Sequence, residues 1–423
     1  MFPEKFYQYL WQHRLFYPSG MQTTDGEEVE VINPGFANTD AGPDFFNAQV
    51  RIGGTYWAGN VEIHRTSDDW VAHRHNTDPL YNNVILHVVA QHTDTKVVTS
   101  TGRQVPELVM QFPDSITARY EELLQSNNFI RCQSRLSEVA QLTRDSWLDR
   151  LLLERFEQRN ERVEKFLSDF GGDWEQTFFC LLARSMGFVV NAEPMEQMAR
   201  QTPVRILLKH NNITQMEALL FGQAGLLPQS ATDEYTATLI REYDFLKAKF
   251  DLKPINGEMW KFLRLRPQNF PTIRLSQLAA IIALTPGNFE SAFRSLDVAS
   301  ILKRLEVSAS EYWNTHFLFG KTAEKDAPKK LGLQSRRLLI INVTVPFVFA
   351  YAHRYGNENE QLNVVRMLQF LPTERNSCLD KWKAVGLEPH NEGEAQALLL
   401  LYKKYCQPRR CLSCRFGHEI LTT

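Results

Sequence analysis

The hydrophobic periodicity of the chain changes near residue 115, and this change constrains the fold more than any other feature. Before it, apolar residues alternate with polar ones in short runs, which is typical of strands; after it, they recur at helical spacing. The pattern predicts an α+β protein with a mixed-sheet α/β sandwich over residues 1–115 and a large all-helical domain over 116–405. A cysteine-rich tail follows over residues 406–423.

The first part of the chain predicts a helix from Pro3, three strands, a second helix from the N-cap candidate Ser67, a fourth strand and a further hairpin. Gly53-Gly54 is the expected turn between the second and third strands. The predicted strands cover residues 27–33, 46–52, 55–64, 83–92, 96–100 and 105–111.

Helices are predicted from residue 115 onward, with a polar connector at 322–330. The clearest are 115–125, 143–170, 174–188, 216–223, 236–250 and 275–284, and the last is expected at 394–406. The apolar run 338–353 is too short for a membrane span and predicts a buried helix or strand. The N-terminus lacks the pattern of a secretory signal, so we expect a cytoplasmic protein with no membrane partner.

Two carboxylates and an imidazole are expected to converge on the second and third strands. Residues two apart on a strand face the same way, so Glu62 and His64 project together. The hairpin brings Asp44 close to Glu62, and two such carboxylates repel each other unless a cation lies between them. Their hard oxygens suit Mg²⁺ or Mn²⁺. His64 could then position or deprotonate a metal-bound water.

Three further histidines follow in the next elements. His73 and His75 are two apart and point apart if both lie on one helix, whereas His75 is freed if the helix ends at His73. We expect His73 to support the metal ligands or to face phosphate, and Asp78 and His87 are weaker candidates. The competing interpretation is structural: Glu62 pairs with an arginine such as Arg51, and the histidines are ordinary core and helix-face residues.

Pro43-Asp44 followed by Glu62-Ile63-His64 resembles the motif of the PD-(D/E)xK nuclease superfamily, with histidine where lysine is usual. The predicted order of elements also resembles that superfamily's αβββαβ core. The resemblance implies that Asp44 and Glu62 bind the metal and that His64 takes the place of the lysine that helps to activate water. It implies a restriction-endonuclease-like fold and cleavage of phosphodiesters.

The whole chain also resembles a bacterial family described only as a domain of unknown function. The matching stretches include "AGPDFFNAQVRI", "GNVEIHRTSDDWVAHRHNTDPLYNNVILHVV", "EALLFGQAGLL", "RPQNFPTIRL" and "YCQPRRCLSC". This resemblance runs from end to end and implies no activity.

The tail "YCQPRRCLSCRFGHEI" predicts a metal site. Cys411 and Cys414 form a C-x2-C chelate, and Cys406 comes from the end of the preceding helix. A fourth ligand could be His418, Cys378 or Cys132. Some nucleases of the resembled superfamily bind an iron–sulfur cluster with one distant cysteine and three near the C-terminus, which favours Cys132. Zinc and iron–sulfur remain open, as does the alternative that these are reduced thiols.

The segment "LRLRPQNFPTIRL" places Arg264, Arg266 and Arg274 around Phe270 and two prolines. Guanidinium groups beside an aromatic ring suit a phosphate backbone with a stacked base. The favoured alternative is a helix-breaking corner whose arginines pair with nearby acids. The net charge of −2 indicates no overall basic surface and leaves a local basic groove open.

These observations favour a metal-dependent nuclease or phosphodiesterase that acts on nucleic acid through Asp44, Glu62, His64 and His73. A second hypothesis is a nucleic-acid-binding or scaffold protein on a degenerate nuclease fold, without turnover. A third is a zinc hydrolase that uses His64, His73 and Glu62.

Overall fold

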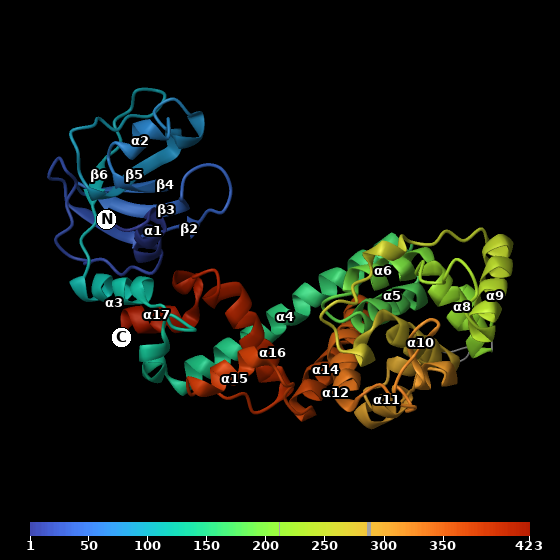
Figure 1. Ribbon diagram of the computed structural model, residues 1–423. Helices are drawn as coiled ribbons and strands as arrows, with labels where there is room; N and C mark the ends of the chain where they lie inside the picture. Colours follow the sequence, from blue (N-terminus) through green and yellow to red (C-terminus); the bar gives the residue numbers. More distant parts are fainter. Residues whose placement is uncertain (211, 286–288) are drawn as a thin grey trace. The chain divides into compact units, whose positions relative to one another are not determined.

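The computed structural model describes residues 1–210, 212–285 and 289–423 (Figure 1). Contacts within the chain divide it into two compact units, Met1–Trp147 together with Leu401–Thr423, and Leu148–Leu400. The first unit is therefore discontinuous, and the helical second unit is inserted into it. This division differs from the boundaries at residues 115 and 405, because residues 116–147 pack with the sheet unit and the tail rather than with the inserted helices.

The first unit contains the mixed sheet. Its strands run in the order β1-β3-β4-β5-β6, with β2 beside β3. β3 and β4 are antiparallel, whereas β4 and β5, and β5 and β6, are parallel. The bounds are β1 Val29–Asn33, β2 Phe36–Ala37, β3 Phe45–Ile52, β4 Thr55–Thr66, β5 Val84–Gln91 and β6 Glu107–Val109.

The predicted hairpin between β3 and β4 is confirmed. Ile52 pairs with Thr55, and the two residues between them, Gly53 and Gly54, have φ values of 55° and 83°. Left-handed backbone at both positions is what a two-residue turn requires, and glycine adopts it without strain. The strand expected at 96–100 is wrong: there, Val98 makes a single bridge to Gln104.

Helices cover both faces of the sheet (Figure 1). Helix α1, Glu4–Gln12, packs on the face that carries Val61 and Ile63. The short α2, Asp69–Ala72, covers the other face, where Trp70 and Tyr81 form a smaller core. Because side chains alternate along a strand, Glu62 and His64 face α2. These helices bury β4 from Gly59 to His64.

The C-terminal tail packs against the segment that follows the sheet. Helix α3 spans Asp114–Gln125 and α17 spans Arg415–Thr422. Arg119 on α3 donates to the carbonyl of Ile420 at 3.0 Å, and the rings of Phe129 and Tyr402 stack at 4.6 Å. The helix predicted to be the last, at 394–406, is thus followed by another. It is itself split into α16, Glu392–Leu401, and a π-helical turn, Tyr402–Cys406.

The second unit is helical, as the periodicity predicts, and adds one short hairpin of β7 His316–Leu318 and β8 Lys321–Thr322. The run 338–353 is a buried helix with a π turn at Ile340–Thr344, just before Pro346. Proline removes a backbone donor there, and Arg159 donates instead to the carbonyl of Ile341 at 2.8 Å.

The helices of this unit not yet given are α4 Gln141–Asp169 (shared with the first unit), α5 Trp174–Met186, α6 Ala192–Gln201, α7 Val204–Leu207, α8 Ile213–Gln223, α9 Glu234–Phe250, α10 Pro271–Ala283, α11 Val298–Arg304, α12 Leu333–Leu339, α13 Val345–Arg354, α14 Glu358–Phe370 and α15 Ser377–Ala384. Among the described residues, no helix combines the length and apolar character needed to cross a bilayer.

Candidate metal centre

Asp44 and Glu62 form one hydrogen-bonded unit at the start of β3 and the middle of β4. The backbone N–H of Asp44 donates to Glu62 Oε2 at 2.9 Å, and the N–H of Ile63 donates to Asp44 Oδ2 at 3.0 Å. The side-chain amide of Gln8, on α1, donates to Asp44 Oδ1 at 2.8 Å. The hairpin therefore brings the two acids together as predicted, and it leaves Glu62 Oε1 to face the histidines.

The histidines reach this oxygen because α2 is short. The helix ends at Ala72, and Arg74 adopts a left-handed conformation with φ of 62°. The chain turns there, so His75 points back under the sheet and stacks on Tyr81 with ring centroids 3.6 Å apart. His73 and His75 can then both approach His64, which they could not do from one helix.

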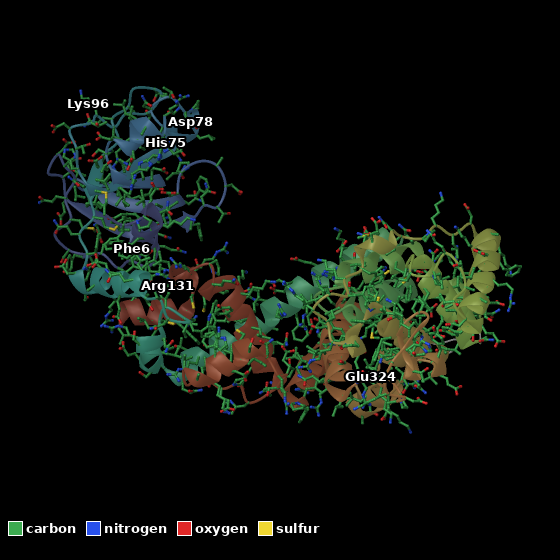
Figure 2. The ribbon with its side chains drawn as sticks, in the orientation of Figure 1. Phe6, His75, Asp78, Lys96, Arg131 and Glu324 are labelled. Carbon is green, nitrogen blue, oxygen red and sulfur yellow. The ribbon has the colours of Figure 1, made fainter. Side chains whose placement is uncertain are left out.

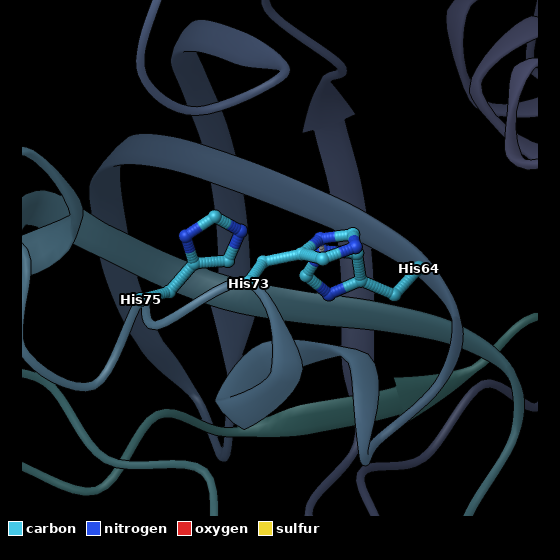
Figure 3. A group of neighbouring side chains, drawn as sticks. All are labelled: His64, His73 and His75. Atoms are coloured by element: carbon cyan, nitrogen blue, oxygen red, sulfur yellow. Dashed lines mark hydrogen bonds between the residues drawn. The ribbon is translucent and has the colours of Figure 1, made fainter.

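Three imidazoles gather in this space (Figure 3), and one carboxylate oxygen of Glu62 lies beside them. Ligand nitrogens of His64, His73 and His75 all lie within 4.8 Å of one another. Glu62 Oε1 lies 3.3 Å from His64 Nε2 and 3.2 Å from His75 Nε2, and His73 Nδ1 lies 3.1 Å from His64 Nε2. Among the residues that the structure describes, no other set of histidines, cysteines and acids is gathered so closely.

These separations fit a bound metal ion. Ligand atoms about 2.0–2.1 Å from a tetrahedral ion stand about 3.3 Å from one another. His75 Nε2 is buried and makes no hydrogen bond of acceptable geometry, although Glu62 Oε1 is near. A buried polar nitrogen without a hydrogen bond is costly. Bonding to a metal would satisfy it, so the three histidines fit a bound ion, with Glu62 Oε1 beside two of them.

A chain of hydrogen bonds determines which nitrogen of His64 faces this space. Glu107 Oε2 lies 2.9 Å from His87 Nδ1, and His87 Nε2 lies 2.9 Å from His64 Nδ1. The Glu107 carboxylate can only accept, so His87 donates to it from Nδ1. Nε2 of neutral His87 therefore accepts a hydrogen bond from His64 Nδ1. His64 Nε2 is left with a lone pair directed at the other ligands, the arrangement by which a carboxylate orients metal-binding histidines.

The pKa values of this network follow from burial and pairing. Burial lowers the pKa of His87 despite the adjacent Glu107 carboxylate, which keeps the ring neutral. Burial also raises the pKa of Asp44, and the neighbouring charge of Glu62 adds to the effect. For Glu62, burial acts in the same direction, but the close imidazoles of His64 and His75 outweigh it and hold its pKa below the usual range. At neutral pH, Glu62 is therefore the anionic ligand.

The other polar residues near the site have structural partners. Asp78 caps the turn at Pro79–Asn83 by accepting from Leu80 N–H at 2.9 Å. Arg51 pairs with Glu30 rather than with Glu62. The sequence did not indicate Glu107 or Gln8 as members of the site. It also did not predict the contacts that His75 and His87 make there. Glu107 lies within the predicted strand 105–111, but only the parallel pairing of β5 with β6 places it beside His87.

The cysteines of the tail line one pocket of the first unit. Cys132, Cys406, Cys411 and Cys414 line it together with Arg131 and Tyr405. Arg131 is labelled in Figure 2. Burial raises the pKa of Cys132 to about 12 and that of Cys414 to about 11. Cys132 thus lines the same pocket as the three cysteines of the tail.

The two other candidates for a fourth ligand have different surroundings. His418 Nδ1 is hydrogen-bonded to the hydroxyl of Tyr9 at 2.8 Å. Cys378 belongs to α15 in the second unit.

The arginines of the second unit differ in exposure. Arg274 is buried, donates to Asn269 and Gln277 at 2.7 and 2.9 Å, and lies over the ring of Phe188. These contacts suit a packed corner. Arg264 and Arg266 are exposed, and their contact with nucleic acid stays a prediction.

Comparisons with known proteins identify the family and go no further. The model of a family described as "Protein of unknown function (DUF2851)" matches residues 4–377, so the chain belongs to that family. No curated protein and no solved structure matches it.

Proposed function

We propose that this DUF2851 chain is a metal-dependent hydrolase of phosphodiester bonds, with nucleic acid as its substrate class. The convergence of three imidazoles and Glu62 Oε1 carries the proposal. The order of elements around it, with Asp44 before one antiparallel strand and Glu62 on the next, supports it through the resemblance to PD-(D/E)xK nucleases. The proposal places the protein in the cytoplasm, where cysteine-rich tails stay reduced.

Glu62, His64, His73 and His75 are the proposed ligands of the ion. Imidazole nitrogen suits zinc and other transition metals, whereas Mg²⁺ prefers oxygen. The donor set therefore favours Mn²⁺ or Zn²⁺ over Mg²⁺. A bound divalent ion supplies Lewis acidity toward a phosphoryl oxygen and lowers the pKa of its water.

The remaining groups act by holding the ligands in place. Asp44 holds Glu62 Oε2 through its backbone N–H, so that Oε1 faces the histidines. Glu107 and His87 set the tautomer of His64. His73 is exposed, which leaves the site open to solvent on its side, and the neighbouring Arg74 is also exposed. A cation beside the opening suits an anionic substrate.

Cleavage assays with single- and double-stranded DNA and RNA test the proposal. We expect hydrolysis that depends on Mn²⁺ or Zn²⁺ and is lost in Glu62→Gln, a change that keeps the size of the side chain and removes the anionic ligand. Glu30→Gln, at an exposed position on β1, is the matched control and should cleave like wild type. Cleavage by Glu62→Gln at the wild-type rate would remove Glu62 from the mechanism.

The second hypothesis, a nucleic-acid-binding or scaffold protein without turnover, rests on the histidine at the position where the resembled superfamily carries lysine. Specific binding of Mn²⁺ without cleavage of any of these substrates would favour it. An electron paramagnetic resonance titration with Mn²⁺ measures that binding directly.

A further inference from the structure

The strongest feature outside the histidine site is the pocket lined by Cys132, Cys406, Cys411 and Cys414, which we call the cysteine pocket. Its residues come from both sides of the inserted helical unit: Cys132 precedes the insertion and the other three follow it. No disulfide joins any of the cysteines. Four thiols around one space are a complete ligand set for either a zinc ion or an iron–sulfur cluster.

The distances between the thiols distinguish a zinc site from an iron–sulfur cluster. Four thiolates on one zinc ion, with Zn–S of about 2.3 Å, stand about 3.8 Å from one another. In the part of the chain that the structure describes, no three cysteine sulfurs lie mutually within 4.8 Å, although the three histidine nitrogens do. In a four-iron cluster each thiolate binds a different iron atom, so the sulfurs stand farther apart.

The four thiols nevertheless line one pocket, so a ligand set too wide for a single ion is gathered in one place. We propose that the cysteine pocket binds a [4Fe–4S] cluster through Cys132, Cys406, Cys411 and Cys414.

The surroundings suit an anionic cluster. Arg131 is buried beside the pocket, and its guanidinium is held by the carbonyls of Leu123 and Leu124 at the end of α3. Cys414 is the residue before the first turn of α17, whose free backbone N–H groups and dipole favour negative charge. Burial of Cys414 and the arginine beside the site limit access of water to the cluster.

A tight backbone contact shapes the pocket. A Cβ atom on Gly417 would lie 2.1 Å from the carbonyl oxygen of Cys411, so only glycine lets α17 start this close to the C-x2-C turn. The tail is also fixed without metal, by the contact of Arg119 with Ile420 and by Glu419, which accepts from Ala140 N–H at 2.7 Å. Variants of one cysteine are therefore expected to keep the fold.

Chemical analysis of the full chain, purified without oxygen, tests the cluster independently of any hydrolase activity. We expect about four iron and four acid-labile sulfide per chain, a brown colour with broad visible absorption, and a paramagnetic signal after reduction with dithionite. Cys132→Ala and Cys411→Ala should each lower bound iron and sulfide at least about tenfold. Cys378→Ala, outside the pocket, is the matched control and should match wild type.

Three outcomes overturn the proposal. One is a purified chain that contains zinc and no sulfide, with the zinc lost in Cys132→Ala and kept in Cys378→Ala. Another is a chain that takes up no cluster even after anaerobic reconstitution with ferrous iron and sulfide. The third is equal sulfide content in wild type and Cys132→Ala. Because the histidine site lies elsewhere in the unit, failure of the cluster leaves the proposed hydrolase untouched, and the reverse also holds.

Discussion

His75→Phe should have opposite effects on the metal-free and metal-loaded protein. In the metal-free protein the change removes a buried nitrogen that makes no acceptable hydrogen bond, and the new ring keeps the stack on Tyr81. An unsatisfied buried polar group costs about 1–3 kcal/mol, so the metal-free variant should be as stable as wild type or more stable. A histidine with a structural role alone would give the opposite sign.

The metal-loaded protein should lose stabilisation in the same variant. At a free-metal concentration about a thousand times the dissociation constant, binding stabilises wild type by about 4 kcal/mol. Loss of one ligand weakens the affinity by at least about 100-fold, which leaves about 1.4 kcal/mol at the same concentration. The expected difference between wild type and variant is therefore about 2.7 kcal/mol.

Urea unfolding of the full chain with EDTA, and again with Zn²⁺ or Mn²⁺, measures both effects, with the transition of the sheet unit monitored by its tryptophans. His353→Phe, an exposed position on α13, controls for the loss of any one histidine. A His75→Phe variant that keeps the full metal-dependent gain in stability and is clearly less stable than wild type in EDTA would rule out His75 as a metal ligand.

Three further predictions concern other parts of the chain. Glu107→Ala should weaken metal binding about 10- to 100-fold by freeing the tautomer of the ligand histidine, which isothermal titration measures; unchanged affinity would contradict the hydrogen-bond chain. Gly417→Ala should cost about 1–3 kcal/mol because its Cβ meets the Cys411 carbonyl at 2.1 Å, whereas Gly332→Ala, with nothing within 4 Å, should be neutral in the same thermal melts. Burial raises the pKa of Glu392 to about 7, so the stability that its neutral form contributes is fully present below pH of about 4.5 and is lost as the pH rises through 7. Glu392→Gln should therefore be up to about 3 kcal/mol more stable than wild type at pH 8 and nearly equal to it at pH 4. The same difference in stability at both pH values would contradict the raised pKa.

The sequence predicted the elements of the first unit well because their signals are local. Alternation of apolar residues over 46–52 and 55–64, with Gly53-Gly54 between them, is enough to define β3, β4 and their turn. The prediction of a strand at 96–100 was wrong because this segment is a loop. Val97 packs in it with Trp70, and the carbonyl of Val98 accepts from the Trp70 indole, so an apolar residue is buried there without strand pairing. The short β7–β8 hairpin was missed because its strands have three and two residues, too few to show alternation, and it ends where the polar connector begins.

The candidate site was predictable only in part. Strand periodicity brought Glu62 and His64 together, and the hairpin added Asp44. The end of α2 at Ala72 decided whether His75 could join, and helix ends are poorly specified by sequence when the helix has a single turn. Glu107 was beyond reach, because its approach to His87 depends on the parallel pairing of two strands 20 residues apart along the chain.

Because the first unit is discontinuous, its two candidate metal sites are assembled from different parts of the chain. The histidine site is built from one continuous stretch, β3 to β6, so it can form before the inserted helices are complete. The cysteine pocket needs Cys132 from before the insertion and Cys414 from after it, so it closes only when the tail has returned to the sheet unit. A cluster bound there would add a covalent tie across a loop of more than 250 residues, the kind of long loop whose closure contributes most. The position of the cysteine pocket thus supports a structural role, in which the cluster ties the tail to the sheet unit. The histidine site instead has an exposed ligand, His73, which a site that acts on a substrate requires.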